Sequence, residues 1–228
     1  MSLEPLTIGI KRGTFRVNDA QAKRADSAFE LGRPAALRQT KYRCARCFYE
    51  SQDNPARKRK SSLHVHHLDN DHQNNEPGNY MPICSLDHAY HHIGCDAPTS
   101  GGSAGWASQM VIAFIPEIEA ETLNAFQRAV GAALTDPDEA ELAFEMVSLL
   151  GATSLPVRDV MGSFQAKDFA AAFGAMKEAD YHQRDRATAG LRVLFHPNIL
   201  KAVGAEMLAD SPLFTVKQWE GVSRGFGV

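Results

Sequence analysis

The sequence predicts an α+β fold in which a small core, stabilised by a bound metal ion, is followed by a helical extension. All four cysteines and seven of the nine histidines lie between Cys44 and Cys95. Two apolar segments, residues 63–68 and 106–115, have the composition of β-strands. After Pro116 the apolar residues recur mainly at helical spacing. Together these observations indicate a metal-binding α+β region followed by helices.

Before the first cysteine we expect a short hairpin over residues 6–17, a helix over residues 19–30 and a second short helix over residues 34–42. The hairpin would turn at Gly13, between two segments of strand-like composition. The first helix would end at Gly32, because glycine is favoured at helix C-termini.

The block that is rich in cysteine and histidine is expected to contain a polar loop, a strand and a helix. The loop covers residues 51–62, the strand residues 63–68, and the helix residues 82–92. Cys84 falls in the first turn of this helix. Asp87 falls where a carboxylate interacts favourably with the N-terminal end of the helix dipole.

The remainder of the chain predicts one strand followed by helices. The strand is expected over residues 106–115, and Ala-rich helices over residues 164–177 and 198–210. One further helix has an apolar stripe, which we expect to be a core or docking face. Its members are Leu142, Met146, Leu149 and Leu150.

The spacing of the cysteines predicts a structural Zn²⁺ site. Cys44 and Cys47 form a Cys-x-x-Cys knuckle, and Cys84 at the start of a helix is the third ligand. A fourth ligand three or four residues further along would lie on the same helix face. His88, at the fourth residue, is the first choice, and Asp87, at the third, is the alternative.

The N-terminus and the length of the apolar stretches favour a cytoplasmic protein. The N-terminus lacks a basic segment followed by an apolar run, and the longest apolar stretch, residues 110–116, is too short to span a bilayer. Thiols stay reduced in the cytosol, which favours metal binding over disulfides.

The charge of the chain is unevenly distributed. Residues 1–60 contain fourteen Lys/Arg and six Asp/Glu, whereas the remaining residues contain ten Lys/Arg and twenty-one Asp/Glu. The basic part could meet nucleic acid, an acidic protein segment or the chain's own acidic part.

The order of these motifs resembles the HNH (ββα-metal, treble-clef) arrangement. In that arrangement a Cys-x-x-Cys knuckle precedes a strand ending in His-His, an Asn and a helix that opens with Cys. His67 takes the position of the general base, Asn79 that of the middle Asn and His88 that of the last His. Asp87 stands where the family has its fourth cysteine.

A longer resemblance, over about residues 14–134, is to the DotN (IcmJ) family of the Dot/Icm type IVB secretion coupling complex. The segments that carry it are Arg38-x-x-Lys-Tyr-Arg-Cys-x-x-Cys-Phe, Leu68-Asp-x-Asp-x-x-Asn-Asn-x-x-x-Asn79, Cys84, a Gly-rich loop, Phe114-Ile-Pro-Glu-Ile and Thr122-Leu-Asn124. The resemblance implies an HNH-like zinc-binding domain over residues 1–134, followed by a helical extension over residues 135–228.

The DotN resemblance implies a non-enzymatic adaptor that binds the cytoplasmic tail of a coupling-protein ATPase together with other coupling-complex subunits. Such a protein would be cytoplasmic, recruited to the inner membrane through its partner without inserting directly, and would not be expected to bind nucleic acid. Its zinc would be structural, and it would have no catalytic residues.

The alternative is an HNH-type metal-dependent nuclease acting on DNA. In that case His67 would activate water, Asn79 would orient the water or the loop, and residues 57–60 would hold phosphate. If His88 completes the zinc site, however, it cannot also hold a catalytic Mg²⁺. His91 and His92 would then have to substitute for it.

Overall fold

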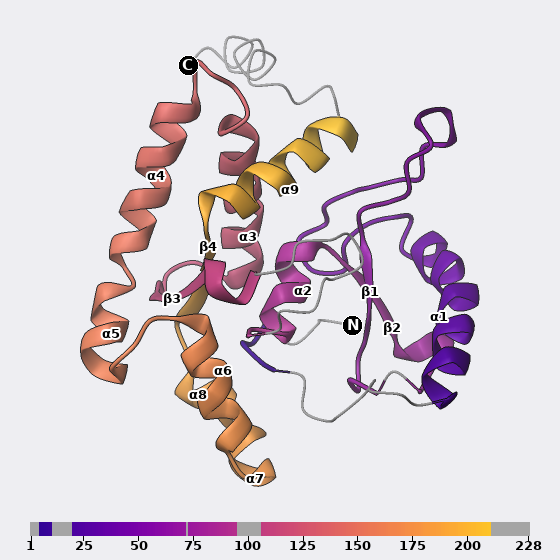
Figure 1. Cartoon of the computed structure of the whole chain (residues 1–228), viewed down its shortest axis with the longest axis horizontal. Coiled ribbons are helices and arrows are strands. Elements are labelled where there is room, and N and C mark those ends of the chain that lie inside the picture. The colour runs from indigo at the N-terminus through magenta and orange to yellow at the C-terminus, as the bar shows by residue number, and fades with distance from the viewer. Residues whose placement is uncertain (1–4, 11–19, 72, 95–105, 211–228) are drawn as a thin grey trace.

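The computed structural model describes residues 5–10, 20–71, 73–94 and 106–210 (Figure 1). In this part of the chain helices accompany two separate two-stranded antiparallel sheets, which confirms the expected α+β class. The strands are β1 (His64–His67), β2 (Tyr80–Ile83), β3 (Met110–Phe114) and β4 (Leu191–Phe195). The α-helices are α1 (Ala20–Gln39), α2 (Ser85–His91), α3 (Ala120–Ala133), α4 (Ala140–Ala152), α5 (Leu155–Met161), α6 (Ala166–Ala175), α7 (Glu178–Tyr181), α8 (Arg184–Ala187) and α9 (Pro197–Asp210).

The first sheet pairs β1 with β2 and has a helix on each side. His64 lies opposite Ile83, and His67 lies opposite Tyr80. Figure 1 shows α1 on one side of this sheet and α2 on the other. β2 corrects the expected start of the helix over residues 82–92, because Pro82 and Ile83 belong to this strand and α2 begins at Ser85. Among the described residues β2 pairs with another strand along one edge only, and proline is tolerated at such an edge.

α1 corrects the expectation of two short helices divided near Gly32, because one helix runs through Pro34. Gly32 allows close packing: a Cβ atom there would lie 2.6 Å from Cε2 of Tyr80. Beyond the proline, Ala36 and Leu37 are buried in the core. Tertiary packing therefore outweighs the tendency of proline to break the helix.

The expected hairpin over residues 6–17 has its second half outside the described residues. The described part of it, residues 6–10, forms no strand. Instead, the N–H of Gly9 donates to the carbonyl of Tyr90 at 2.8 Å, and the Gly9 carbonyl accepts from the N–H of Ile93 at 3.0 Å. This segment therefore runs along the C-terminal end of α2.

The second sheet joins segments that are far apart in the sequence. Met110 of β3 lies opposite Phe195 of β4, and Phe114 lies opposite Leu191. β4 corrects the expectation that the chain is helical from Pro116 onward, because a five-residue apolar run does not reveal by periodicity alone whether it is a strand. The sheet also links the two sides of the expected boundary after residue 134.

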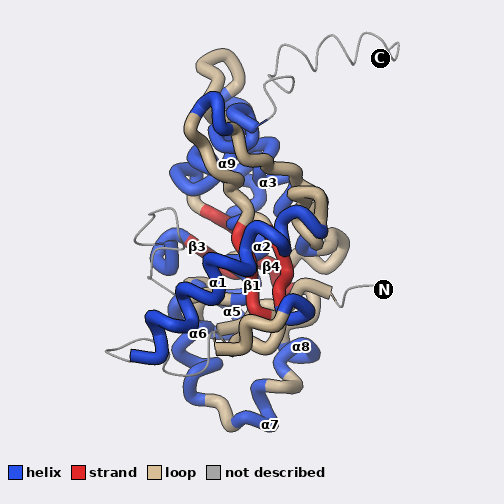
Figure 2. The backbone as a smooth tube through the Cα atoms, turned by 90° about the vertical axis from the view of Figure 1, so that its right-hand side faces the viewer, coloured by secondary structure: helices blue, strands red, loops and turns tan. Residues whose placement is uncertain are grey.

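α3 and α9 approach each other closely and tie the end of the described chain to the centre of the molecule. A Cβ atom at Gly131 would lie 2.0 Å from the carbonyl oxygen of Leu200, and one at Gly204 would lie 2.1 Å from the carbonyl carbon of Gly131. Figure 2 shows these two helices side by side, with α7 and α8 at the opposite end of the molecule. The buried hydroxyl of Tyr90 accepts from the N–H of Val193, so α2 and β4 share one core.

Candidate metal centres

Four acidic side chains meet beside the start of α2 and form what we call the thiol site. Its members are Cys44, Cys47, Cys84 and Asp87, whose ligand atoms all lie within 4.8 Å of one another. Sγ of Cys44 is 3.0 Å from Oδ2 of Asp87, and Sγ of Cys47 is 3.6 Å from Sγ of Cys84. Three soft thiolates and one carboxylate are a donor set that suits Zn²⁺.

Backbone N–H groups point at the sulfur atoms and hold the knuckle in position. The N–H groups of Arg46 and Cys84 donate to Sγ of Cys44 at 3.4 and 3.3 Å. Cys84 caps α2, and its Sγ accepts from the N–H of Asp87 at 3.4 Å. These bonds stabilise negative charge on sulfur, which is the form that binds metal.

The protonation states of the thiol site are mutually dependent. Burial raises the pKa of Cys44, but hydrogen bonds from Cys47 and Cys84 bring it down to about 5. Hydrogen bonds with Cys44 and Cys84 raise the pKa of Cys47. Burial and the charge of Cys84 raise the pKa of Asp87 to about 7. Four acidic groups this close cannot all ionise without a cation among them, and a divalent metal ion would allow them to do so.

The structure brings Asp87, rather than His88, to the three cysteines. Asp87 lies three residues after Cys84 and is fully buried, facing the knuckle. His88, the first choice for the fourth ligand, belongs to a different cluster, described below. Cys95 lies outside the described residues.

α3 supports the thiol site with a buried chain of hydrogen bonds. Nδ2 of Asn124 donates to Oδ1 of Asp87 at 2.7 Å, which leaves the other carboxylate oxygen facing Cys44. Nε2 of Gln127 donates to Oδ1 of Asn124 and to the Val193 carbonyl, at 3.3 and 3.1 Å. Asn124 is one of the residues that carry the DotN resemblance, but the resemblance assigned it no role. The sequence did not indicate Gln127.

Arg128 places a buried positive charge beside the same site. Its Nη1 lies 3.9 Å from Sγ of Cys47, and its guanidinium stacks over the ring of Tyr49 at 4.0 Å. The side chain is buried, and its Nη2 has no hydrogen-bond partner among the described residues. Three thiolates, a carboxylate and a divalent ion carry a net charge of about −2, which this cation would partly offset. The sequence did not indicate Arg128, because its partners lie far away in the chain.

Replacing Asn124 with leucine, a side chain of similar size, should weaken metal binding at the thiol site by about 10- to 100-fold. The Asp87 carboxylate would lose its fixed orientation. Competition titration with a chromophoric chelator measures this affinity. Ser148→Ala on exposed α4 is the control, and equal affinity in the Asn124 and Ser148 variants would contradict the role of Asn124.

A second cluster, which we call the histidine site, consists of His66, His88 and His92. One nitrogen from each ring lies within 4.8 Å of the others. His66 comes from β1, whereas His88 lies on α2 and His92 caps that helix, four residues later on the same face. The rings of His66 and His88 are 5.5 Å apart between centroids, and those of His88 and His92 are 4.7 Å apart.

Two further imidazoles border the histidine site. The ring of His91 stacks on His66 at 4.3 Å, and the ring of His64 lies 5.0 Å from His88. Burial and the neighbouring His64 hold the pKa of His88 well below its usual range. Burial lowers the pKa of His64 to about 4 and, with His92, that of His91 to about 3. His64, His88 and His91 are therefore neutral near pH 7, which is the form in which an imidazole binds a metal ion.

The donor chemistry of the histidine site fits a transition-metal ion. Nδ1 of His88 is buried and has no hydrogen-bond partner in the described part of the chain. Such an atom calls for an explanation, and a bound metal ion would satisfy it. Neutral imidazoles suit Zn²⁺, Ni²⁺, Cu²⁺ or Fe²⁺ better than Mg²⁺.

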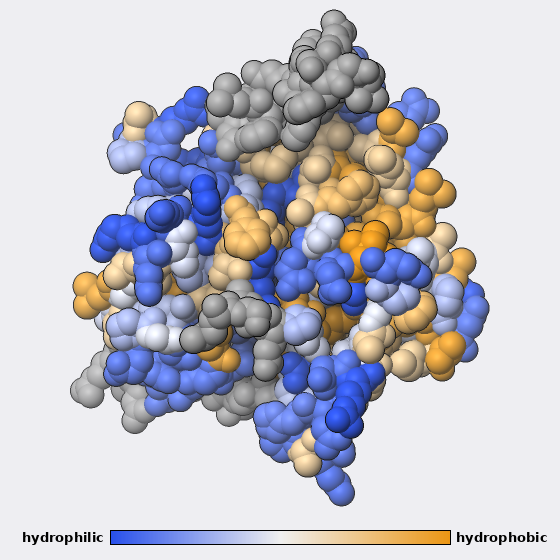
Figure 3. Space-filling model, turned by 180° about the vertical axis from the view of Figure 1, so that it is seen from behind, coloured by the Kyte–Doolittle hydropathy of each residue, from blue (hydrophilic) through white to orange (hydrophobic). Residues whose placement is uncertain are grey.

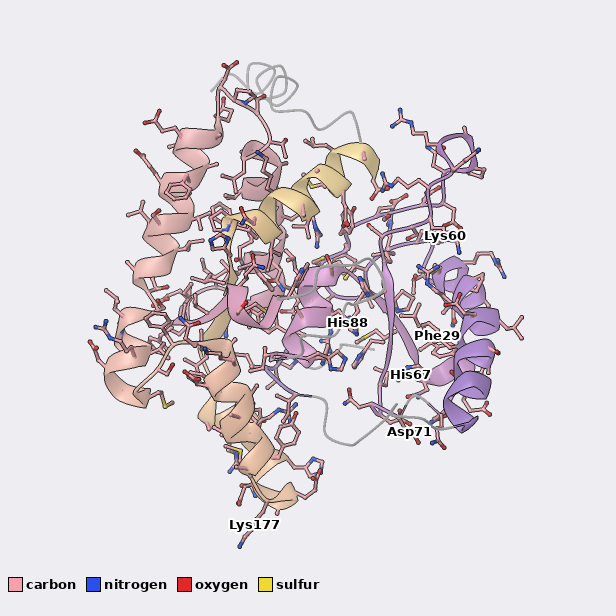
Figure 4. All side chains as sticks on the ribbon, viewed as in Figure 1. Phe29, Lys60, His67, Asp71, His88 and Lys177 are labelled. Atoms are coloured by element: carbon pink, nitrogen blue, oxygen red, sulfur yellow. The ribbon has the colours of Figure 1, made fainter. Side chains whose placement is uncertain are left out.

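His67 points away from the histidine site, because successive residues of a strand face opposite sides. Its Nε2 is 3.2 Å from Oδ1 of Asn75, and its ring lies 5.5 Å from Phe29 of α1 and 5.3 Å from Tyr80. Figure 4 shows His67 on the α1 side of β1, with His88 on the α2 side. The amide oxygen of Asn75 can only accept, so this hydrogen bond favours a proton on Nε2 of His67.

Asn79 fixes the loop that connects β1 to β2. Its Nδ2 donates to Oδ1 of Asp69 and to the carbonyl of Asn74, both at 2.8 Å. Its Oδ1 accepts from the N–H of Asp69 at 3.1 Å. Asn79 therefore orders the segment that follows His67 and is not a member of either metal cluster.

The chain matches no protein-family model, and no curated protein is significantly similar to it. The chemistry of the two clusters is therefore the basis for a functional proposal.

Proposed function

We propose that this protein is an HNH-type, metal-dependent nuclease with a structural Zn²⁺ at the thiol site and a catalytic metal ion at the histidine site. One observation carries the proposal: His88 lies with His66 and His92, while Asp87 lies with the three cysteines. The objection drawn from the sequence was that His88 could not serve both sites. With Asp87 as a ligand of the structural ion, that conflict disappears.

Each residue has a specific role under this proposal. His66, His88 and His92 would hold the catalytic ion, which would stabilise charge on the phosphate and on the leaving oxygen. His67 would accept a proton from the attacking water. Asn75 orients the His67 ring, and Asn79 orders the loop beside it.

The opposite orientation of His66 and His67 suits the geometry of phosphodiester hydrolysis. In an in-line displacement the attacking and leaving oxygens lie on opposite sides of phosphorus. A phosphate at the edge of β1 would therefore have the metal ligand His66 on one side and the base His67 on the other. β1 is hydrogen-bonded to β2 along one edge, and in the described residues no strand pairs with its other edge.

The loop before β1 supplies positive charge for a phosphate backbone. Arg57, Lys58 and Lys60 are exposed, whereas Arg59 is paired with Asp210 at the end of α9. Figure 4 shows Lys60 near the end of β1 at which the strand begins. Neutralising phosphates is the main source of affinity for nucleic acid that is independent of sequence.

Incubation of the pure protein with supercoiled plasmid and Mn²⁺, Ni²⁺, Zn²⁺ or Mg²⁺ tests the proposal. We expect nicking or linearisation that EDTA stops. His67→Ala should slow cleavage by about 100-fold or more, whereas His182→Ala, on an exposed residue near α7, should not. A lack of cleavage with all four ions, or equal rates in the two variants, would refute it.

The adaptor function is our second proposal, with the cytoplasmic tail of a coupling-protein ATPase as partner. The apolar surface of α4 and α5 supports it, because such surfaces often mark protein interfaces. A pull-down from the native host, analysed by mass spectrometry, should recover this ATPase. Its absence from the recovered proteins would count against the adaptor function.

A further inference from the structure

The apolar stripe of α4 that the sequence predicts as a core or docking face lies largely outside the core. The inner face of the helix consists of Ala143, Val147 and Leu150, which pack against the protein. The neighbouring stripe has the same spacing but is exposed. It comprises Leu142 (55% exposed), Met146 (39%) and Leu149 (73%).

α5 continues the apolar surface of α4. Leu155, Val160 and Met161 are exposed on α5, and together with Leu142, Met146 and Leu149 they form what we call the α4–α5 face. Figure 3 shows apolar side chains gathered along the edge of the molecule that these helices form.

The junction is fixed to the second sheet. The N–H of Phe114 in β3 donates to the carbonyl of Thr153 at 3.1 Å. The hydroxyl groups of Thr153 and Ser154 donate to the carbonyls of Leu150 and Gly151, both at 2.6 Å. Val157 anchors α5 in the core. The face is therefore preformed, so a partner would not have to order it, which favours binding.

The charge of the surrounding surface is strongly negative. Residues 135–163 contain six Asp/Glu residues and a single basic residue, Arg158. Arg158 is itself paired with Asp159 at 3.0 Å. Glu141 and Glu145 are exposed on the solvent side of α4, next to the apolar stripe. Like charges would oppose the pairing of two copies through this face and its approach to an anionic bilayer.

We propose that the α4–α5 face binds an amphipathic helix of another protein, with apolar residues on one side and Lys or Arg along its edges. Leu and Met side chains suit this mode of recognition, because they adapt to the anchors of a docking helix. The flanking carboxylates would pair with the basic edges and fix the orientation of the helix. This inference deepens the adaptor proposal, on which it rests, by naming the surface and the chemical class of the partner, and it does not depend on nuclease activity. A failed pull-down of the ATPase would count against the adaptor partner, whereas the peptide experiment below tests the face itself.

A membrane is the competing occupant. Among the described residues, the segment Ala140–Met161 is long and apolar enough to cross a membrane, judged by length and composition alone. In the structure, however, it is two helices with a turn at Thr153, and it includes Glu141, Glu145 and Arg158. Charged residues at these positions oppose burial in a bilayer.

Fluorescence anisotropy with a labelled 18-residue peptide of leucine and lysine, arranged as an amphipathic helix, tests the proposal on the full chain. We expect saturable binding that weakens at least tenfold in Leu149→Ser and in Glu145→Lys. Leu31→Ser on α1, which removes an equally exposed leucine elsewhere (83% exposed), should leave the affinity unchanged. A matched peptide with glutamate in place of lysine should bind at least tenfold more weakly.

Three outcomes would overturn the proposal. The first is equal loss of affinity in the Leu31 and Leu149 variants, or equal binding of the two peptides. The second is co-sedimentation with phosphatidylcholine/phosphatidylglycerol vesicles that Leu149→Ser abolishes, which would assign the face to a membrane. The third is self-association in analytical ultracentrifugation that the same variant abolishes. Thermal melts should show that all three variants fold, because the substituted side chains are exposed.

Discussion

Replacing His88 with alanine is expected to remove one bound metal ion and to lower DNA cleavage by about a thousandfold. The histidine site would lose one of three ligands, and metal stabilisation of the phosphate contributes several kcal/mol to such reactions. The thiol site should keep its metal ion, because His88 is not one of its members. Elemental analysis and plasmid cleavage by the same preparation measure both effects.

The neighbouring residue provides the matched control for this experiment. Asp87→Ala should release the ion of the thiol site and lower the thermal stability, because the carboxylate lies among the three cysteines. Adjacent substitutions would then remove different metal ions. If both variants lose the same ion, the division into two sites is wrong.

The double substitution Cys44→Ser and Cys84→Ser should abolish cooperative folding of the region around the first sheet. Among the described residues between 40 and 94, the regular secondary structure consists of β1, β2, α2 and two short 3-10 segments, which offer little hydrophobic stabilisation of their own. A structural Zn²⁺ contributes about 10–16 kcal/mol of apparent binding free energy in small zinc-binding peptides, and this becomes folding free energy. Circular dichroism melts and metal analysis give the two readouts.

The wild-type protein offers an independent measurement of the same effect. Prolonged incubation with a strong chelator should lower its melting temperature, and added Zn²⁺ should restore it. A double cysteine variant that melts as the wild type does would contradict the structural role of this metal ion.

The parts of the site that are set by local spacing were predicted from the sequence. The Cys-x-x-Cys spacing fixes the geometry of Cys44 and Cys47 locally. Cys84 lies 37 residues after Cys47 and was assigned to the same site from its thiol and its place at a helix start. The choice between Asp87 and His88 could not be made in this way, since both positions lie on nearly the same helix face. The contact that orients Asp87 comes from Asn124 on α3, a helix that the metal motif does not include.

The fold was less predictable where packing opposes local preference. Periodicity indicated an apolar face on α4, but it could not show that Ala143, Val147 and Leu150 pack inward while Leu142, Met146 and Leu149 stay exposed. α1 continues through Pro34 because Leu37 and its neighbours are held in the core. β4 pairs with β3, and no local signal in either strand specifies that partner.

The pairing of Gln127 with β4 has a consequence for synthesis of the protein. Its Oε1 accepts from the N–H of Phe195, and its Nε2 donates both to the Val193 carbonyl and to Asn124. During translation the ligands Cys44 to Asp87 leave the ribosome long before β4 does. A nascent chain can therefore acquire its metal ion early, but the ligand sphere becomes rigid only after β4 has been made. Contacts this distant in sequence also form slowly.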